Sequence, residues 1–117
     1  MNANDFVEQI RKAVIEDNLA IYRDLFATTE VDAATDAYWV RALSLYAKLE
    51  EAERDVLFEF ARQVMVDTVS NVFAILDGVS FLEGQEGEIS LAIGESREQI
   101  NGELQDRFLE LEEDDGV

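Results

Sequence analysis

Apolar side chains recur at helical spacing along the first 27 residues of the chain. Phe6, Ile10 and Val14 open the series, and Asn4 before them has the side-chain oxygen that a helix N-cap requires. The pattern predicts a first helix over residues 4–27.

Two more helical patterns follow this first helix. Trp39 and Leu43 lie on an apolar stripe that predicts a helix over residues 35–48, with Thr35 or Asp36 as its cap. From 56 to 76 apolar residues occur almost all round the helix and leave one narrow polar line, which is typical of the central helix of a domain.

The limits of this central helix are marked at both ends. Glu50 is a weak cap at its start, and a continuous helix through 49–52 is the alternative. Gly78 suits the left-handed position that ends a helix, and Asp77 precedes it.

Beyond Gly78 the apolar spacing changes from helical to alternating. Ile89, Leu91 and Ile93 alternate with Ser90 and Ala92, the period of a half-buried strand. The stretch before them contains two glycines in a loop of hairpin length. We therefore expect a β-hairpin at about 79–94, packed on the helices because an isolated hairpin is marginal in water.

A short helix completes the predicted architecture. Apolar residues from Ile100 to Leu111 predict it over residues 101–113, after the pair Asn101-Gly102. The fold class is then α+β, mainly α: three long helices, one β-hairpin packed on them and a C-terminal helix. A single domain is expected over 1–111, followed by a frayed acidic tail at 112–117.

Composition removes several kinds of chemistry. Forty-eight per cent of the residues are apolar, which argues against disorder, and the chain has no cysteine and no histidine. Thiolate chemistry and histidine-based catalysis are thereby excluded, and so are zinc sites built on cysteine. No cofactor is predicted. The first residues lack a signal peptide and no apolar run is long enough to span a membrane, so a cytoplasmic location is expected.

The charge is strongly negative and unevenly distributed. The chain has 27 acidic and 9 basic residues, a net charge of −18, and residues 83–117 hold twelve of the acids but only two of the bases. This balance argues against direct binding to nucleic acid or to an anionic membrane. It favours a basic protein partner. A solvated face that only keeps the protein in solution is the simpler alternative.

Seven carboxylates around the predicted hairpin and on the last helix are the candidate partner-binding residues. Three of them are spaced three and four apart on the last helix and share one outward face, where like charges repel each other. A basic partner would relieve that repulsion. The seven are Glu83, Glu86, Glu88, Glu98, Glu103, Asp106 and Glu110.

Three alternatives stay open. Carboxylates are the only abundant catalytic-type groups, so an enzyme that uses magnesium or manganese on a small phosphorylated substrate is the first. Its candidate ligands, Glu50, Glu51, Glu53, Asp55, Glu59 and Asp67, match no metal motif by their spacing. A DNA mimic is the second, and it needs acids spaced like phosphates. The third is self-association as a homodimer through an apolar face that includes Trp39, Tyr38 and Phe58.

The stretches "VFAILDGVS" and "INGELQDRFLE" resemble segments of small bacterial proteins of unknown function, in which a helix ends in an Asp-Gly turn before a hairpin and a short helix. The resemblance covers residues 63–111 and carries no catalytic motif. In size and acidity the chain is also similar to immunity proteins that neutralise basic toxin domains. The leading hypothesis is a non-enzymatic acidic domain that binds a basic protein, as an inhibitor or immunity-type protein does.

Overall fold

The helices account for the regular structure of residues 1–115, which are the residues described by the computed structural model of the protein. The N-terminal helix is continuous over 3–28, because α1, the π-helical stretch η1 and α2 follow one another without a break. The element bounds are α1 Ala3–Ile10, η1 Arg11–Glu16, α2 Asp17–Thr28, the 3₁₀ turn η2 Val31–Ala33, α3 Ala37–Lys48, α4 Glu51–Leu76 and α5 Leu104–Asp115.

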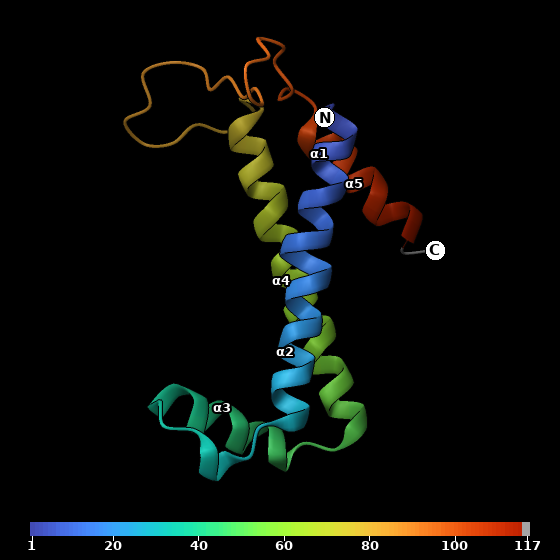
Figure 1. The fold of residues 1–117 in the computed structure, drawn as a ribbon, viewed down its shortest axis with the longest axis vertical. Helices are drawn as coiled ribbons and strands as arrows, with labels where there is room; N and C mark the ends of the chain where they lie inside the picture. The colour runs from blue at the N-terminus through green and yellow to red at the C-terminus, as the bar shows by residue number, and fades with distance from the viewer. Residues whose placement is uncertain (116–117) are drawn as a thin grey trace.

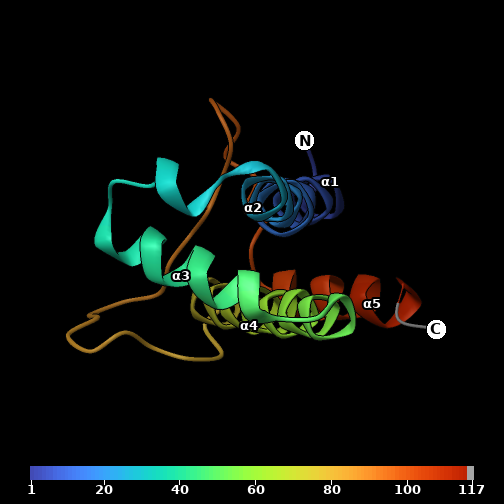
Figure 2. The same ribbon diagram turned by 90° about the horizontal axis from the view of Figure 1, so that it is seen from below.

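The N-terminal helix and α4 run side by side in opposite directions and form the long axis of the molecule (Figure 1). α3 lies across one end of this pair. α5 lies at the other end, where it packs on both α1 and α4. Seen along the long axis, the N-terminal helix and α4 form two separate columns, and the segment 77–103 projects beside them (Figure 2).

The helix starts follow from side-chain caps. Asn2 accepts a hydrogen bond from the Asp5 backbone N–H at 2.8 Å, so α1 begins slightly before the predicted limit. Asp36 caps α3, as predicted. Glu50 and Glu53 form a reciprocal capping box at the start of α4, which separates it from α3 and makes Glu50 a better cap than its residue type alone indicates.

Two apolar clusters hold the helices together. The main core brings α1, η1, α4 and α5 together through Val7, Ile15, Val66, Val69, Phe73, Leu104 and Phe108. At the far end, aromatic rings from α2, α3 and α4 meet, with Phe26 between Trp39, Tyr46 and Phe58 at centroid distances of 4.9 to 6.1 Å. Trp39 and Tyr46 thus belong to this cluster, whereas Tyr38 is exposed.

The predicted β-hairpin is wrong, and the fold is all-α instead of α+β: residues 1–115 contain four helices and no strand. Although residues 89–93 alternate as a strand does, no second strand pairs with them. The Asn101 side chain binds their backbone instead, because Leu91 N–H donates to Asn101 Oδ1 at 2.9 Å and Ile89 C=O accepts from Asn101 Nδ2 at 2.7 Å. A single backbone bond, from Ile100 N–H to Leu91 C=O at 2.9 Å, accompanies these two. Val79, Phe81 and Leu82, the other expected strand, are exposed to solvent.

The last helix is shifted toward the C-terminus relative to the prediction. It begins at Leu104, after a buried Asn101 and a Gly102 with φ of +133°, and it extends to Asp115. Residues 112–115, predicted as a frayed tail, are therefore helical. Residues 116–117 of that predicted tail lie outside the described residues.

The molecule is unusually extended for its length. Its Cα radius of gyration is 18.0 Å and its principal extents are 51 × 36 × 26 Å, whereas a compact domain of this size has a radius of about 13 Å. Its accessible surface is 8356 Å², against roughly 6,400 Å² for a folded monomer of the same mass. Much of the apolar surface is therefore exposed.

Candidate functional site

The α1–α5 junction is organised around the end of α4. Gly78, with φ of +81°, ends that helix as predicted. The carboxylate of Asp77 accepts hydrogen bonds from the backbone N–H groups of Gly102 at 2.7 Å, Leu104 at 3.1 Å and Gln105 at 2.8 Å. One side chain at the end of α4 is thus the N-terminal cap of α5, and it positions α5 beside α1.

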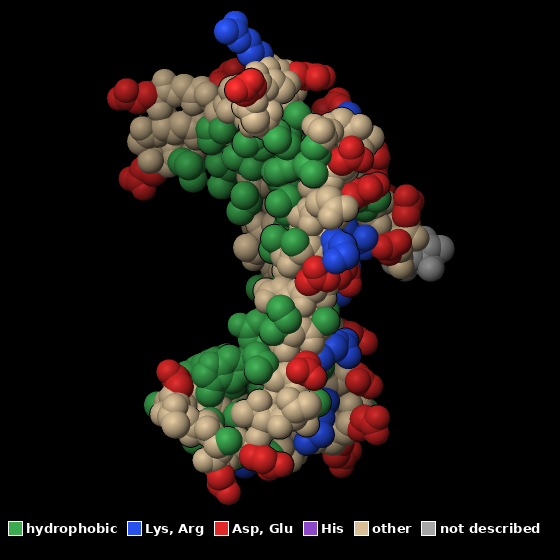
Figure 3. All heavy atoms as spheres, viewed as in Figure 1, with side chains coloured by type: hydrophobic (Ala, Val, Ile, Leu, Met, Phe, Trp, Pro, Cys, Tyr) green, Lys and Arg blue, Asp and Glu red, His purple; other side chains and the backbone are tan. Residues whose placement is uncertain are grey.

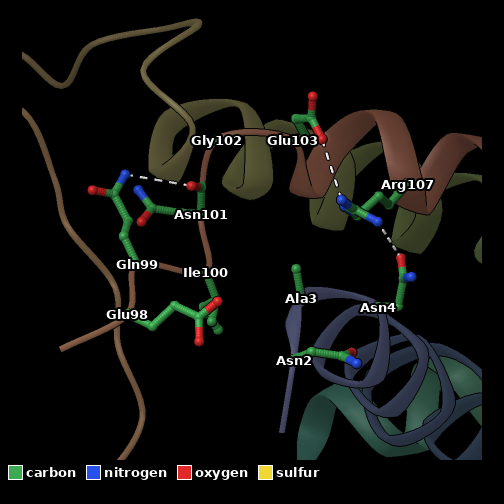
Figure 4. A pocket seen from close by; sticks show the side chains of 10 residues that line it. All are labelled: Asn2, Ala3, Asn4, Glu98, Gln99, Ile100, Asn101, Gly102, Glu103 and Arg107. Carbon is green, nitrogen blue, oxygen red and sulfur yellow. Dashed lines mark hydrogen bonds and ion pairs between the residues drawn. The ribbon is translucent and has the colours of Figure 1, made fainter. Parts of the chain in front are cut away.

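A cleft of about 420 Å³ opens beside this junction, between the start of α1 and the segment that leads into α5. Arg107 lies at one side, where its guanidinium donates to Asn4 Oδ1 and, at 3.2 Å, to Glu103 Oε2 (Figure 4). Glu98 lies on the opposite side. The remaining lining residues are mostly amides or small: Asn2, Ala3, Gln99, Ile100, Asn101 and Gly102.

A second, smaller crevice continues along α1 and α5. Asn4 and Arg107 line both spaces. The crevice is also lined by Glu8 of α1 and by Glu110 and Asp114 of α5. We call the combined feature the acidic groove. Its charged residues are Glu8, Glu98, Glu103, Glu110 and Asp114 around Arg107.

The groove brings together three of the seven predicted partner-binding residues, Glu98, Glu103 and Glu110. Asp106 is exposed on α5 but lines neither space. Glu83, Glu86 and Glu88 are exposed on the segment 77–103, which projects to the side of the molecule opposite α5 (Figure 1). The seven residues therefore do not form one patch, although all of them are accessible.

Two groove residues were missed from the sequence, for different reasons. Asp114 follows Glu110 by four positions, so its place on the same face of α5 could have been inferred once the helix was extended to Asp115. Glu8 offered no comparable signal, because only the packing of α1 on α5 brings it to the groove.

A partly buried ion-pair cluster at the other end of α5 was also not predicted. Glu112 accepts from Arg11 Nε at 2.6 Å and from Arg62 Nη1 at 2.7 Å, and Arg62 also pairs with Glu16 at 2.7 Å. The side chain of Glu112 is only 14% exposed. Its two partners come from η1 and α4, and nothing in the local pattern indicates these long-range pairs.

Hydrogen bonds within this cluster favour the charged forms of Glu112, Arg62 and Arg11. Burial by itself would raise the pKa of Glu112, but hydrogen bonds from Arg62 and Arg11 outweigh that effect and lower it. The hydrogen bond to Glu112 raises the pKa of Arg62. Burial opposes the same change at Arg11, yet its bonds to Glu112 and Asp115 raise the pKa of its guanidinium as well.

Residues 1–115 contain neither a carboxylate metal site nor a membrane-spanning helix. No group of three or more carboxylates there is arranged to hold a metal ion, and the metal-dependent enzyme stays an untested alternative. None of the helices in this part of the chain is both long and apolar enough to cross a membrane.

In comparison with known proteins, no family model, curated protein or solved structure matches the chain. The resemblance of residues 63–111 to small bacterial proteins therefore stays a prediction.

Proposed function

We propose that the protein is a non-enzymatic binding domain that holds basic side chains of a protein partner in the acidic groove, as an inhibitor or immunity-type protein would. The observation that carries the proposal is the gathering of five carboxylates around one guanidinium at the α1–α5 junction. Because Glu103 already pairs with Arg107, the other four carboxylates are left to attract cations.

The chemical groups that line the groove suit a polypeptide ligand. It combines exposed carboxylates with the side-chain amides of Asn2 and Gln99, which can donate to or accept from a peptide backbone. Exposed carboxylates of this kind mainly accelerate encounter and select the partner by charge, and each exposed ion pair contributes only about 0.2–1 kcal/mol. Affinity would then fall steeply as salt rises.

A pull-down from an extract of the native host tests the proposal when it is run with two matched triple variants. E8Q/E98Q/E110Q removes three charges from the groove and leaves the Glu103–Arg107 pair intact. E83Q/E86Q/E88Q removes three charges from the projecting segment. We expect a basic protein to be retained at about 50 mM salt, released at about 500 mM, and lost from the groove variant only.

Two outcomes contradict the proposal. The first is that no basic protein is retained by the unmodified chain at low salt. The second is that the two variants lose the captured protein equally, because total charge and not the groove would then control binding.

A further inference from the structure

An uncharged stripe runs along the face of α4 that is turned away from the core. Its members recur every three or four residues, so at 100° per residue they lie within about 40° of one line. That line is on the opposite side of the helix from Phe58, Val69 and Phe73, which are buried. We call it the outer stripe: Leu57, Phe60, Val64, Thr68, Asn71 and Ile75.

The outer stripe is exposed along its middle. Phe60 is 70% exposed and Val64 is 50% exposed, and they are flanked by the exposed Val56 and Val72. An isolated apolar residue at the surface is ordinary, but a continuous apolar face on a long helix indicates an interaction site.

The apolar surface extends from α4 onto the hollow side of the molecule. Tyr22 of α2 and Tyr38 of α3 line, with Leu57 and Ala61, a groove of about 290 Å³ that is mostly apolar. In the space-filling view, apolar side chains gather along this hollow side at both ends of the molecule, and carboxylates crowd the opposite edge (Figure 3).

The charge of this region fits self-association. Between Gln63 and Leu82 there is no lysine or arginine and there are only two carboxylates, in a chain of net charge −18. Both are engaged: Asp67 accepts from Gln63 at 2.9 Å and Asp77 caps α5. Two copies that meet here would therefore bring few like charges together, whereas a basic partner would find few charges to bind.

We propose that a second copy of this chain covers the outer stripe, with the two α4 helices antiparallel about a two-fold axis. The spacing of the stripe is self-complementary under that symmetry. Leu57 of one copy would lie against Ile75 of the other, and Val64 against Thr68. The ends of the hollow would be closed by the aromatic groove and by Val79 and Phe81 of the opposite copy.

The excess of exposed surface matches the area that a homodimer interface would bury. The chain exposes 8356 Å², roughly 2,000 Å² more than a folded monomer of its mass. Obligate homodimers bury about 1,000–2,500 Å² from each subunit. Pairing through α4 would bring the exposed area per chain back into the normal range, and it leaves the acidic groove on α1 and α5 accessible.

Sedimentation equilibrium at tens of micromolar protein tests this pairing. The unmodified chain should sediment at twice its 13.2 kDa mass. Val64→Glu, which would place two carboxylates near the axis, should sediment as a monomer with unchanged helical circular dichroism. Leu109→Glu, an exposed apolar position on α5, is the matched control and should remain a dimer.

Cysteine cross-linking keeps the test independent of any folding defect, because the chain has no cysteine of its own. Oxidised V64C/T68C should migrate as a covalent dimer without reductant, whereas D106C/E110C, the same spacing on α5, should migrate as a monomer. A monomeric unmodified chain overturns the proposal, including one that binds a different protein through this stripe. So does a dimer that V64E leaves intact and V64C/T68C does not cross-link.

Discussion

Asp77 contributes to the ends of two helices. It is the last residue before the glycine that ends α4, and its carboxylate accepts hydrogen bonds from three backbone N–H groups at the start of α5. The first role could be predicted, because an Asp-Gly pair after an apolar helix is a common stop signal. The second could not, since the amides that it binds are 25 to 28 positions further along the chain.

Replacing Asp77 with alanine should therefore destabilise the protein by about 1–2 kcal/mol, the usual cost of losing an N-cap. Hydrogen exchange should accelerate at the Gly102, Leu104 and Gln105 amides, which lose their acceptor. Asp24→Ala, at an exposed position on α2, is the control and should change the free energy of unfolding by less than about 0.5 kcal/mol. Equal losses in urea unfolding would mean that the Asp77 cap contributes nothing special.

At the scale of the elements, α5 is fastened at both ends by charge. Asp77 holds its first turn, and Glu112 near its last turn joins it to η1 and α4 through Arg11 and Arg62. Glu112→Gln removes the anion between two guanidinium groups. We expect it to cost about 1–2 kcal/mol at neutral pH, whereas Glu113→Gln, on an exposed neighbour, should be close to neutral.

The stabilisation by the Glu112 ion pairs should decrease as the pH falls. The folded pKa of Glu112 lies below its ordinary value of 4.5, so the ion pairs stabilise the fold above that pH and are lost as the pH falls through the folded value. The stability difference between the unmodified chain and E112Q should therefore shrink when urea unfolding is repeated well below pH 4.5. A difference that is the same at both pH values would contradict the ionic role.

The helices could be predicted from the sequence, and the segment 77–103 could not. Helical spacing over 4–27, 35–48 and 56–76 reflects contacts that each helix makes along its own length, and the structure confirms all three with small changes at the ends. Alternation at 89–93 shows only that one side of the segment is buried. Whether a strand forms depends on a pairing partner, and here the Asn101 side chain and the Ile100 N–H bind the backbone groups instead.

The candidate groove shows the same limit. The run Glu103 to Glu110 could be placed on one helix face from its spacing, but the cleft exists only because α1 packs on α5, and that contact joins the two ends of the chain.

For the whole molecule, the extended shape makes the stability of the fold depend on dimer formation if α4 pairs with a second copy. Dissociation would then accompany unfolding, so the melting temperature of the unmodified chain should rise with concentration, by about 4 °C for each tenfold increase. The V64E chain should melt at a temperature that does not depend on concentration. Differential scanning calorimetry over two decades of concentration distinguishes the two, and a constant melting temperature for both chains would separate folding from assembly.

Because the Asp77 carboxylate at the end of α4 caps the start of α5, and Asn101 Nδ2 donates to Leu76 C=O beside it, the segment between the two helices is a loop whose two ends are held together. The number of residues in this loop therefore does not determine how α4 and α5 are placed. A Cβ added at Gly84 or Gly87 would have no neighbouring atom within 4 Å. Foreign peptides inserted near these glycines would therefore lengthen the loop without separating the helices that it connects.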